Sequence, residues 1–298
     1  MKSRIVILII SVIIAITILA VGILGLSGAK DKDNKNSSGN IQKEDSDSSS
    51  DNDKDMDEVS QEITSETESL TQETTTASDI PANVSVNNIP VNTQVDPSKP
   101  MVALTFDDGP SRNNTVKILE ALKQHGARAT FFMLGYNIEG NEDIIKQMAE
   151  QGCEPANHTA NHGDLSKLDE SGIHTEVDTV ADKIKALTGQ NNVLVRPPYG
   201  ATSEVVMSTL TEPVILWSVD TEDWKTRNAQ AVVSHIQNNV FDGCIILMHD
   251  IYPETADAAV QIIEWLDSQG YQMVTVSELG YYRRGGLQTG TKYGSLQP

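Results

Sequence analysis

The chain has 298 residues, and its 42 acidic side chains outnumber its 22 lysines and arginines, giving a formal net charge of -20 at pH 7. This acidity argues against nucleic-acid binding, because no basic cluster is available to neutralise phosphates. Two cysteines are too few for a disulfide scaffold, and they form no CxxC zinc pair. A bridge between Cys153 and Cys244 stays open, but each lies beside an apolar or strand-like segment, which favours two buried free thiols.

Residues 1–26 are predicted to form a membrane anchor. Lys2 and Arg4 precede an apolar run that extends to about Leu26, and about 20 apolar residues suffice to span a bilayer. The apolar region of a signal peptide is usually only about 7–15 residues long. The length therefore favours an uncleaved single-pass anchor, with secretion after cleavage near residues 26–29 as the alternative. Positive charges before the span predict a cytoplasmic N-terminus and an extracellular remainder.

Residues 27–98 are predicted to form a disordered linker. They are rich in Asp, Ser, Asn, Glu and Thr and show no sustained apolar period. Such a segment cannot bury enough apolar surface to offset the entropy lost on ordering. Its expected role is a tether that holds a domain away from the membrane. Residues 80–95 contain more Val, Ile and Pro and are expected to pack loosely on that domain.

Residues 99–283 are predicted to form one α/β domain, because short β-favouring runs alternate with amphipathic helical patterns. The fold class is a parallel sheet or barrel, in which active sites gather where strands end. Residues 284–298, rich in glycine and polar residues, are expected to form a flexible tail. Strands are expected at 102–106, 129–134, 193–195, 214–219, 245–248 and 273–276, and helices at 114–125, 142–151, 173–187, 229–240 and 255–269.

Two adjacent aspartates follow the first of these strands. Asp107 and Asp108 come directly after the apolar run 102–106, and Gly109-Pro110 ends the strand. Buried carboxylates are costly unless they are paired, hydrogen-bonded or bound to a metal. Because side chains alternate along a strand, one aspartate could hold a metal while the other accepts a proton. A surface Asp-Asp-Gly turn is the alternative interpretation.

A pair of histidines follows a short segment after the helix predicted at 142–151, in His158-Thr159-Ala160-Asn161-His162. His158 and His162 can converge on one ion if the backbone turns between them, although this spacing alone is weak evidence. Together with Asp108 they would form a ligand set suited to zinc or a similar divalent ion, with positions left open for water.

Three further polar groups follow later strands. Arg196 precedes a rigid Pro-Pro loop and is a permanent cation that could hold Asp107 in place. Asp223 and Trp224 end a segment in which acids lie beside aromatics, and the indole is either core or the wall of a sugar or acyl pocket. His249 follows a buried run, whereas the other unassigned histidines, His125, His174 and His235, fall within helical patterns.

These residues, in this order, make the chain resemble the polysaccharide deacetylase family, also called the NodB homology domain or carbohydrate esterase family four. The resemblance runs from about Met101 to Leu279 and rests on TFDDGP, HTANH, RPPYG, DTEDW and LMHD. Five ordered motifs are far more specific than any one alone. The resemblance implies a deformed (β/α) barrel with a divalent metal, usually Zn2+ but otherwise Co2+ or another ion. It also implies removal of acetyl groups from N-acetylglucosamine units or acetylated sugars.

The family resemblance also implies a role for each site residue. Asp107 would be the catalytic base, oriented by Arg196. His249 would be the general acid, tuned by Asp223. The other assignments are Asp108, His158 and His162 as metal ligands, the backbone N–H of Tyr199 at the oxyanion, and Pro197, Trp224 and Leu247 around the acetyl group.

The chain departs from the family pattern just before the histidine pair. The family usually has Gly-His-Glu-Ile-Gly-Asn-His, whereas residues 152–158 are Gly-Cys-Glu-Pro-Ala-Asn-His. Pro155 cannot donate to a strand ladder, so the strand that leads to His158 is expected to be shortened or shifted.

The expected function is an extracellular, membrane-tethered deacetylase of cell-wall glycan that acts as a monomer. Anchor and tether would place it between membrane and wall, which favours N-acetylglucosamine of peptidoglycan as the substrate. Another glycan, such as a chitooligosaccharide or acetylxylan, is one alternative, and a catalytically silent glycan binder, motivated only by Pro155, is another. A glycosidase is disfavoured, because a pair of carboxyls flanking a glycosidic bond does not explain the histidine pair.

Overall fold

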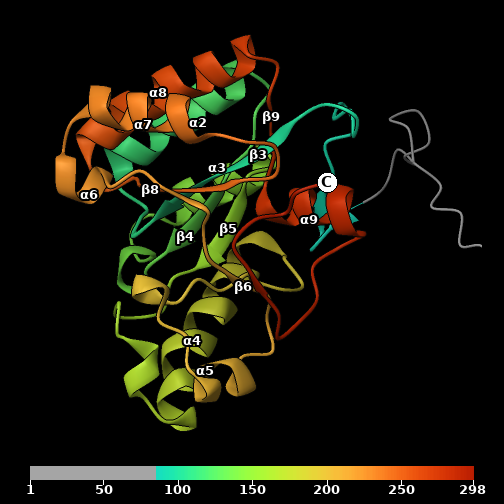
Figure 1. Cartoon of the computed structure of the whole chain (residues 1–298). Helices are drawn as coiled ribbons and strands as arrows, with labels where there is room; N and C mark the ends of the chain where they lie inside the picture. Colours follow the sequence, from blue (N-terminus) through green and yellow to red (C-terminus); the bar gives the residue numbers. More distant parts are fainter. Residues whose placement is uncertain (1–84) are drawn as a thin grey trace, which may run out of the picture. The chain divides into compact units, whose positions relative to one another are not determined.

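A six-stranded parallel sheet forms the centre of residues 85–298, the part of the chain that the computed structural model describes (Figure 1). Five strands lie in the order β5-β4-β3-β8-β7, and β9 pairs with the start of β3. Every strand pair of this sheet is parallel, as predicted for the α/β class. The strands are β3 (Met101–Asp107), β4 (Thr130–Met133), β5 (Glu154–Asn157), β7 (Val219–Asp220), β8 (Ile245–His249) and β9 (Gln272–Met273).

β3 is the central strand, and all seven of its residues are buried. Near-continuous apolar runs are typical of strands covered on both faces, and the strand predicted at 102–106 is confirmed. Phe106 stacks on Phe131 of β4, with ring centroids 5.1 Å apart. In register, Asp107 lies opposite Phe132 of β4 and His249 of β8. The pairing therefore places the ends of β3 and β8 side by side.

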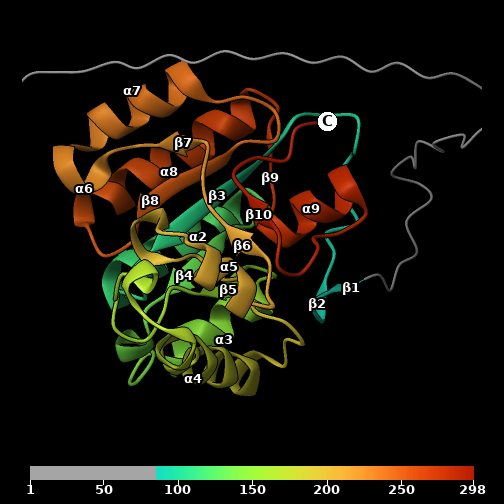
Figure 2. The same cartoon turned by 60° about the horizontal axis from the view of Figure 1, so that its bottom comes forward.

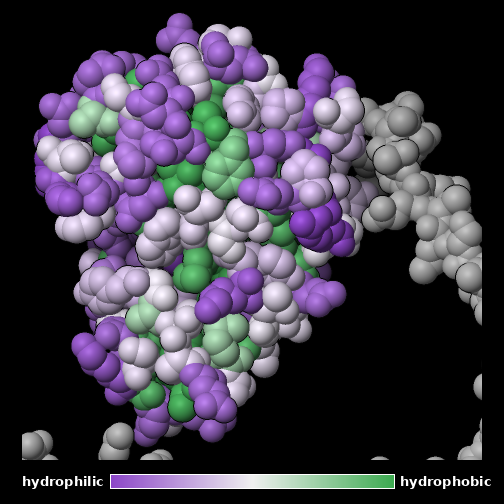
Figure 3. Space-filling model, viewed as in Figure 1, coloured by the Kyte–Doolittle hydropathy of each residue, from purple (hydrophilic) through white to green (hydrophobic). Residues whose placement is uncertain are grey.

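Amphipathic helices flank the sheet, and each predicted helix is present within a few residues of its expected bounds. Helices α2, α7 and α8 lie side by side in Figure 1, and their buried residues join one core cluster with β3, β4 and β8. Their outer surfaces are polar, and Figure 3 shows hydrophilic residues over much of this face. The longer helices are α2 (Arg112–Gln124), α3 (Glu142–Glu150), α4 (Glu170–Thr188), α7 (Ala229–Asn239), α8 (Pro253–Ser268) and α9 (Val276–Arg284).

Two predicted strands are much shorter than expected. Of residues 193–195, only Val195 bridges neighbouring strands, singly to Asn157 and to Val214, because two prolines without N–H groups follow Arg196. The predicted strand 214–219 is split into β6 (Val214–Ile215) and β7, since the guanidinium of Arg196 binds the carbonyls of Ile215 and Leu216. The sheet edge is thus interrupted where a side chain replaces backbone partners.

The last predicted strand is also wrong beyond Met273, because Val276 begins α9. Thr275 accepts a hydrogen bond from the N–H of Glu278, and the Glu278 carboxylate accepts one from the N–H of Thr275. This reciprocal capping box starts the helix. The Thr-x-x-Glu spacing was the signal in the sequence.

Residues 284–298 differ from the flexible tail expected of them. β10 (Lys292–Tyr293) pairs in parallel with β6, and Ser295 bridges Cys244. Leu296 is buried in a core cluster with Ile215 of β6 and Leu279 of α9, and Figure 2 shows this side of the domain. The apolar surface that Leu296 covers explains why this polar-rich segment is ordered.

Pro155 does not displace β5, so the expected shift of the strand is wrong. The N–H groups of Glu154 and His158 donate to Ala129 and Met133 on the β4 side, whereas that of Asn157 donates to Leu194 on the other side. Because N–H directions alternate, the nitrogen of Pro155 faces away from β4, where no ladder bond is lost. All four residues of β5 stay paired in register with β4.

The segment before β3 packs on the domain, as expected for residues up to 95. It contains the small hairpin β1 (Ser85–Val86) and β2 (Ile89–Pro90), and Val95 is buried. The predicted anchor and the rest of the predicted linker lie outside the described residues. Within residues 85–298, no helix is both long and apolar enough to cross a membrane. Both cysteines are buried and free, as favoured from the sequence.

Candidate active site

Three predicted ligands converge at the carboxyl-terminal edge of the sheet. One nitrogen or oxygen atom from each of Asp108, His158 and His162 lies within 4.8 Å of the other two. Asp108 directly follows β3, and the histidines lie in the loop after β5. Asp108 and His162 have φ angles of 73° and 58°. Such positive values are uncommon for residues other than glycine and are found at sites where geometry overrides backbone preference.

A hydrogen bond from Nδ1 of His158 orients its ring so that Nε2 can bind a metal ion. Its Nδ1 lies 2.7 Å from the carbonyl oxygen of Arg196, which accepts the Nδ1 proton. The Nε2 lone pair then faces Oδ1 of Asp108, 3.5 Å away. Burial lowers the pKa of His158, although the charges of Asp107 and Asp108 oppose this effect. A neutral imidazole with a fixed tautomer is the form that binds a metal ion.

The donor set fits a divalent cation. Oδ1 of Asp108 is buried and has no hydrogen-bond partner among the described residues, which is costly for a carboxylate unless a cation compensates it. Nε2 of His162 lies 3.4 Å from this oxygen, and its Nδ1 lies 3.2 Å from the hydroxyl of Tyr199. Two imidazoles and one carboxylate suit zinc, cobalt and similar ions and leave coordination positions open.

Asp107 is held beside this cluster by a buried ion pair. Nη1 of Arg196 donates to Oδ1 of Asp107 at 2.6 Å and to the hydroxyl of Thr105 at 2.8 Å. Arg196 is fully buried, and its guanidinium lies over the ring of Phe132. Burial lowers the pKa of Arg196, whereas the charge of Asp107 opposes that shift. The free Oδ2 of Asp107 points to the cluster, 3.7 Å from Nε2 of His158.

His249 ends β8 beside Asp107 and is paired with Asp223. Its Nδ1 lies 2.8 Å from Oδ1 of Asp223, and its backbone N–H donates to Oδ2 at 2.7 Å. Burial alone would lower the pKa of His249, but the hydrogen bond and charge of Asp223 outweigh burial and raise it to about 9. The Asp223 carboxylate therefore favours the cationic form of His249.

Asp223 is itself fixed by several donors. The hydroxyl of Thr255 donates to its Oδ2 at 2.7 Å, and the N–H of Trp224 donates to its Oδ1 at 2.9 Å. Asp223 is buried at the start of the short helix α6 (Asp223–Thr226). This carboxylate can therefore orient His249 without moving.

The predicted substrate-side residues surround the same edge. Tyr199 has a φ of 61° in the turn η4 (Pro198–Gly200), which turns its hydroxyl toward His162. Trp224 projects into solvent next to Asp223. Leu247 is buried in β8, two residues before His249, and Pro197 is buried beside Arg196. The structure thus gathers all eleven predicted residues around the ends of five chain segments, whereas their roles stay predictions.

Asp250 is one site neighbour to which the sequence analysis assigned no role. It is buried, its Oδ2 accepts a hydrogen bond from Thr115, and its Oδ1 has no partner among the described residues. Burial raises its pKa to about 7. A Cβ at Gly109 would lie 2.3 Å from Oδ1 of Asp250, so only glycine fits there. In the sequence, Asp250 is the last residue of the LMHD motif, directly after His249.

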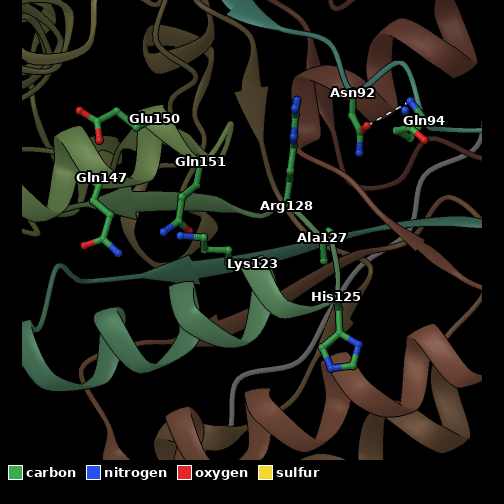
Figure 4. Close-up of a pocket in the computed structure, with 10 residues that line it drawn as sticks. Asn92, Gln94, Lys123, His125, Ala127, Arg128, Gln147, Glu150 and Gln151 are labelled. Atoms are coloured by element: carbon green, nitrogen blue, oxygen red, sulfur yellow. Dashed lines mark hydrogen bonds between the residues drawn. The ribbon is translucent and has the colours of Figure 1, made fainter.

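A separate cavity of about 840 Å³ lies at the ends of α2 and α3, and none of these site residues lines it (Figure 4). Lys123 and His125 come from the end of α2, and Gln147 and Glu150 come from α3. Arg128, which also borders the cavity, donates to the carbonyl of Pro90 at 2.6 Å. The cavity is therefore distinct from the cluster of Asp108 and the histidines.

Comparison with known proteins identifies the family. A family model for polysaccharide deacetylase matches residues 94–212. A peptidoglycan-N-acetylglucosamine deacetylase of Bacillus cereus is 37% identical over 189 residues, which cover 61% of this chain and 69% of that protein. The chain belongs to the polysaccharide deacetylase family. The parallel α/β fold described above agrees with that membership.

Two further members of the family bear on substrate and metal. The peptidoglycan-N-acetylmuramic acid deacetylase PdaC of Bacillus subtilis is 41% identical over 65% of this chain, but the match covers only 42% of PdaC. A solved structure of PdaC superposes on this chain with a TM-score of 0.62, and the aligned region covers 64% of this chain and 95% of the PdaC structure. A family 4 acetyl xylan esterase from Clostridium thermocellum, solved with a cobalt ion, is 29% identical, with a TM-score of 0.62 over 66% of this chain and 98% of that one.

Proposed function

We propose that this chain is a metal-dependent deacetylase of cell-wall polysaccharide, with N-acetylglucosamine of peptidoglycan as its substrate. The observation that carries the proposal is the unpartnered buried oxygen of Asp108 facing two imidazoles, directly beside a second, paired aspartate. Hydrolysis would release acetate and leave a free amine on the glycan. The names of the two peptidoglycan deacetylases described above support peptidoglycan as the substrate class.

Asp108, His158 and His162 would hold the divalent cation, for which zinc is our proposal. When bound, such a cation polarises the acetyl carbonyl and lowers the pKa of nearby water. The three ligands come from the loops after β3 and β5, on either side of β4, and the fold brings them together. The backbone N–H of Tyr199, in its positive-φ turn, is proposed to donate to the developing oxyanion.

Asp107 would accept the proton of the attacking water. Its Oδ1 is held by Arg196, which leaves Oδ2 directed toward the cluster. The oriented carboxylate is thereby available as a general base. His249, whose pKa Asp223 raises, would protonate the leaving nitrogen, because an amine leaves poorly as an anion. Base and acid lie on the adjacent strand ends of β3 and β8, so they can serve the same acetyl group from two sides.

The cellular setting remains a proposal from the sequence. The apolar run before residue 27, preceded by Lys2 and Arg4, favours a single-pass membrane protein with an extracellular domain. The acidic stretch that follows would space the domain from the membrane. Such a position gives access to the wall glycan.

Acetate release tests the proposed function directly. The full chain would be incubated with peptidoglycan and with N-acetylglucosamine oligomers, before and after chelation and after addition of zinc or cobalt. We expect release that chelation abolishes and metal restores. Release from acetylxylan alone would contradict the substrate, and a chain that binds glycan without releasing acetate under any metal would contradict the enzyme and indicate a silent binder.

A further inference from the structure

Exposed aromatic side chains gather at the active-site edge. Four large hydrophobic residues are exposed in the described part of the chain, and three of them are the aromatics Tyr136, Tyr199 and Trp224, which are 59%, 70% and 51% exposed. Tyr199 contacts His162 and Trp224 follows Asp223. Single exposed apolar residues are ordinary, whereas a group around one site indicates a binding surface. Tyr136 is the member of this group that has no role so far.

The turn that carries Tyr136 is fixed between the two loops that hold the cluster. This turn is η2 (Gly135–Asn137), directly after β4. The N–H of Leu134 donates to the carbonyl of Gly109 at 3.1 Å, and that of Gly135 donates to Thr159 at 3.0 Å. The side-chain amide of Asn137 donates to the carbonyl of Asp108 at 2.8 Å. Tyr136 is therefore held between the residues that follow Asp108 and His158.

Glycine at position 135 makes this placement rigid. A Cβ there would lie 2.7 Å from Val180 and 3.0 Å from the Cα of Ala160, so the turn packs directly against α4 and the histidine loop. Partial burial and the charge of Asp108 raise the pKa of the Tyr136 hydroxyl, in keeping with a ring near that aspartate. A rigid aromatic at the surface loses little conformational freedom when it binds a ligand.

Tyr136 and Trp224 lie on opposite sides of the catalytic strand. Tyr136 follows β4 and Trp224 follows β7, and the sheet order β4-β3-β8-β7 separates them by three strand spacings, roughly 14 Å. One pyranose ring is too short to contact both. A glycan that contacts both aromatics must therefore use two sugars, and the sugar at Tyr136 would be the neighbour of the one whose acetyl group lies at Asp107.

We propose that Tyr136 is a specificity-determining residue that stacks on the sugar ring next to the one that is deacetylated. Pyranose rings present a face of C–H groups, which packs on an aromatic face while the ring hydroxyls stay in water. This assignment rests on the proposed function. Tyr136 would then discriminate between glycans of different chain length and would not contact the acetyl group.

The test compares two probes of different length. Acetate release by the full chain, loaded with zinc, is measured for N-acetylglucosamine and for its β-1,4-linked tetramer. We expect Tyr136→Ala to lower kcat/KM for the tetramer by roughly tenfold, mainly through KM, with a much smaller effect on the monomer. Tyr136→Phe keeps the ring face and should restore the tetramer's KM. Tyr281→Ala, on α9 away from the site, is the matched control.

The affinity of the tetramer, measured by calorimetry, distinguishes failure of the proposed deacetylase function from failure of stacking by Tyr136. A wild-type chain that binds the tetramer but releases no acetate would overturn the proposed function, whereas weaker binding by Tyr136→Ala would still support stacking. Equal tetramer affinity in wild type and Tyr136→Ala would overturn stacking even with full activity. An equal loss of kcat/KM on both probes would also overturn it, because that result indicates damage to the Asp108 loop. A wild-type chain that neither binds nor hydrolyses the tetramer would overturn both.

Discussion

Two carboxylates at the active-site edge of the sheet lack the partners that a carboxylate at the opposite end has. At the amino-terminal end of β5, Glu154 accepts hydrogen bonds from Thr130 at 3.0 Å, from the N–H of Ser277 at 3.2 Å and from the hydroxyl of Ser277. At the carboxyl-terminal edge, Asp108 and Asp250 each keep one buried oxygen without a partner among residues 85–298. Both unpartnered oxygens are buried, so solvent does not supply the missing partners.

The contrast separates carboxylates that the protein's own donors complete from carboxylates that keep one oxygen free. Around Glu154, donors from β4 and α9 complete the carboxylate, and Glu278 is completed in the same way by Arg128 and the N–H groups of Asn92 and Thr275. Around Asp108, the neighbouring groups are imidazole nitrogens that can share a cation with it. An incomplete buried carboxylate is costly in the free protein, which is expected where a bound ion completes it.

The largest expected effect comes from removing the charge of the paired aspartate at the active edge. Asp107→Asn keeps the shape of the side chain but cannot accept the water proton, so we expect kcat/KM for acetate release to fall by about 10³-fold. Asp257→Asn, the same change at an exposed position of α8, is the control. Activity within a factor of about ten of wild type would contradict the role of Asp107 as the base, provided that thermal unfolding shows a folded variant.

The matching change at the opposite end should act on stability and not on chemistry. Glu154→Ala leaves the N–H of Ser277 and the hydroxyl of Thr130 unsatisfied, so we expect the free energy of unfolding to fall by about 3 kcal/mol. Urea unfolding measures this loss, with the exposed Glu150→Ala as control. The activity of the folded fraction should change by less than about threefold, because distant sites act independently. A loss comparable to that of Asp107→Asn would show that the two ends are coupled.

Removal of the charge of Asp108 tests whether this carboxylate binds a metal ion or stabilises the fold. Saturation with zinc at about 100 times its Kd should stabilise the wild-type chain by about 2.7 kcal/mol, and Asp108→Asn should lose this gain. The metal-free variant should be no less stable than metal-free wild type, because Asp108 has an unpartnered oxygen there. Thermal unfolding with and without metal measures both quantities. Destabilisation of the metal-free variant would place Asp108 with Glu154, among the acids that serve the fold.

Local patterns in the sequence predicted much of this molecule. The apolar run of β3 and the amphipathic helices were recognisable because their signals lie within a few residues of one another. The eleven site residues were named through five motifs that follow strand ends, and the parallel sheet brings such ends to one edge. Register then places His249 opposite Asp107, which no local pattern could show.

Distant partners account for what the sequence did not predict. The strand expected at 214–219 is split because Arg196, about 20 residues earlier, binds the carbonyls of Ile215 and Leu216. Residues 284–298 are ordered through Leu296, with Leu287 and Tyr293 packed beside it, and three scattered apolar residues give no periodic signal. Pro155 was judged by residue type, whereas its effect depends on which side of β5 its nitrogen faces.

The smallest expected effect is a shift in the pH dependence of kcat. The experiment compares two histidine–aspartate pairs. Only the cationic form of His249 can protonate the leaving amine, so kcat should fall as pH rises through about 9. Asp223→Asn removes the charge that raises this pKa, so the alkaline limb should move to lower pH by at least about one unit. The exposed pair His125–Asp267 on α2 and α8 has a similar 2.8 Å contact, and Asp267→Asn should leave the profile unchanged.

The pH dependence of stability tests the His249–Asp223 pair independently of activity. The folded-state pKa of His249 lies above the ordinary value of 6.5, so its contribution to stability is full below that value and is lost as pH rises through about 9. Wild type should therefore lose unfolding free energy between these two pH values, and Asp223→Asn should lose less. If the variant kept the wild-type alkaline limb in both activity and stability, Asp223 would not be the source of the raised pKa. The charges of Asp107 and Asp108 would then be left as its cause, and the pKa of His249 would depend on the carboxylates proposed as base and ligand.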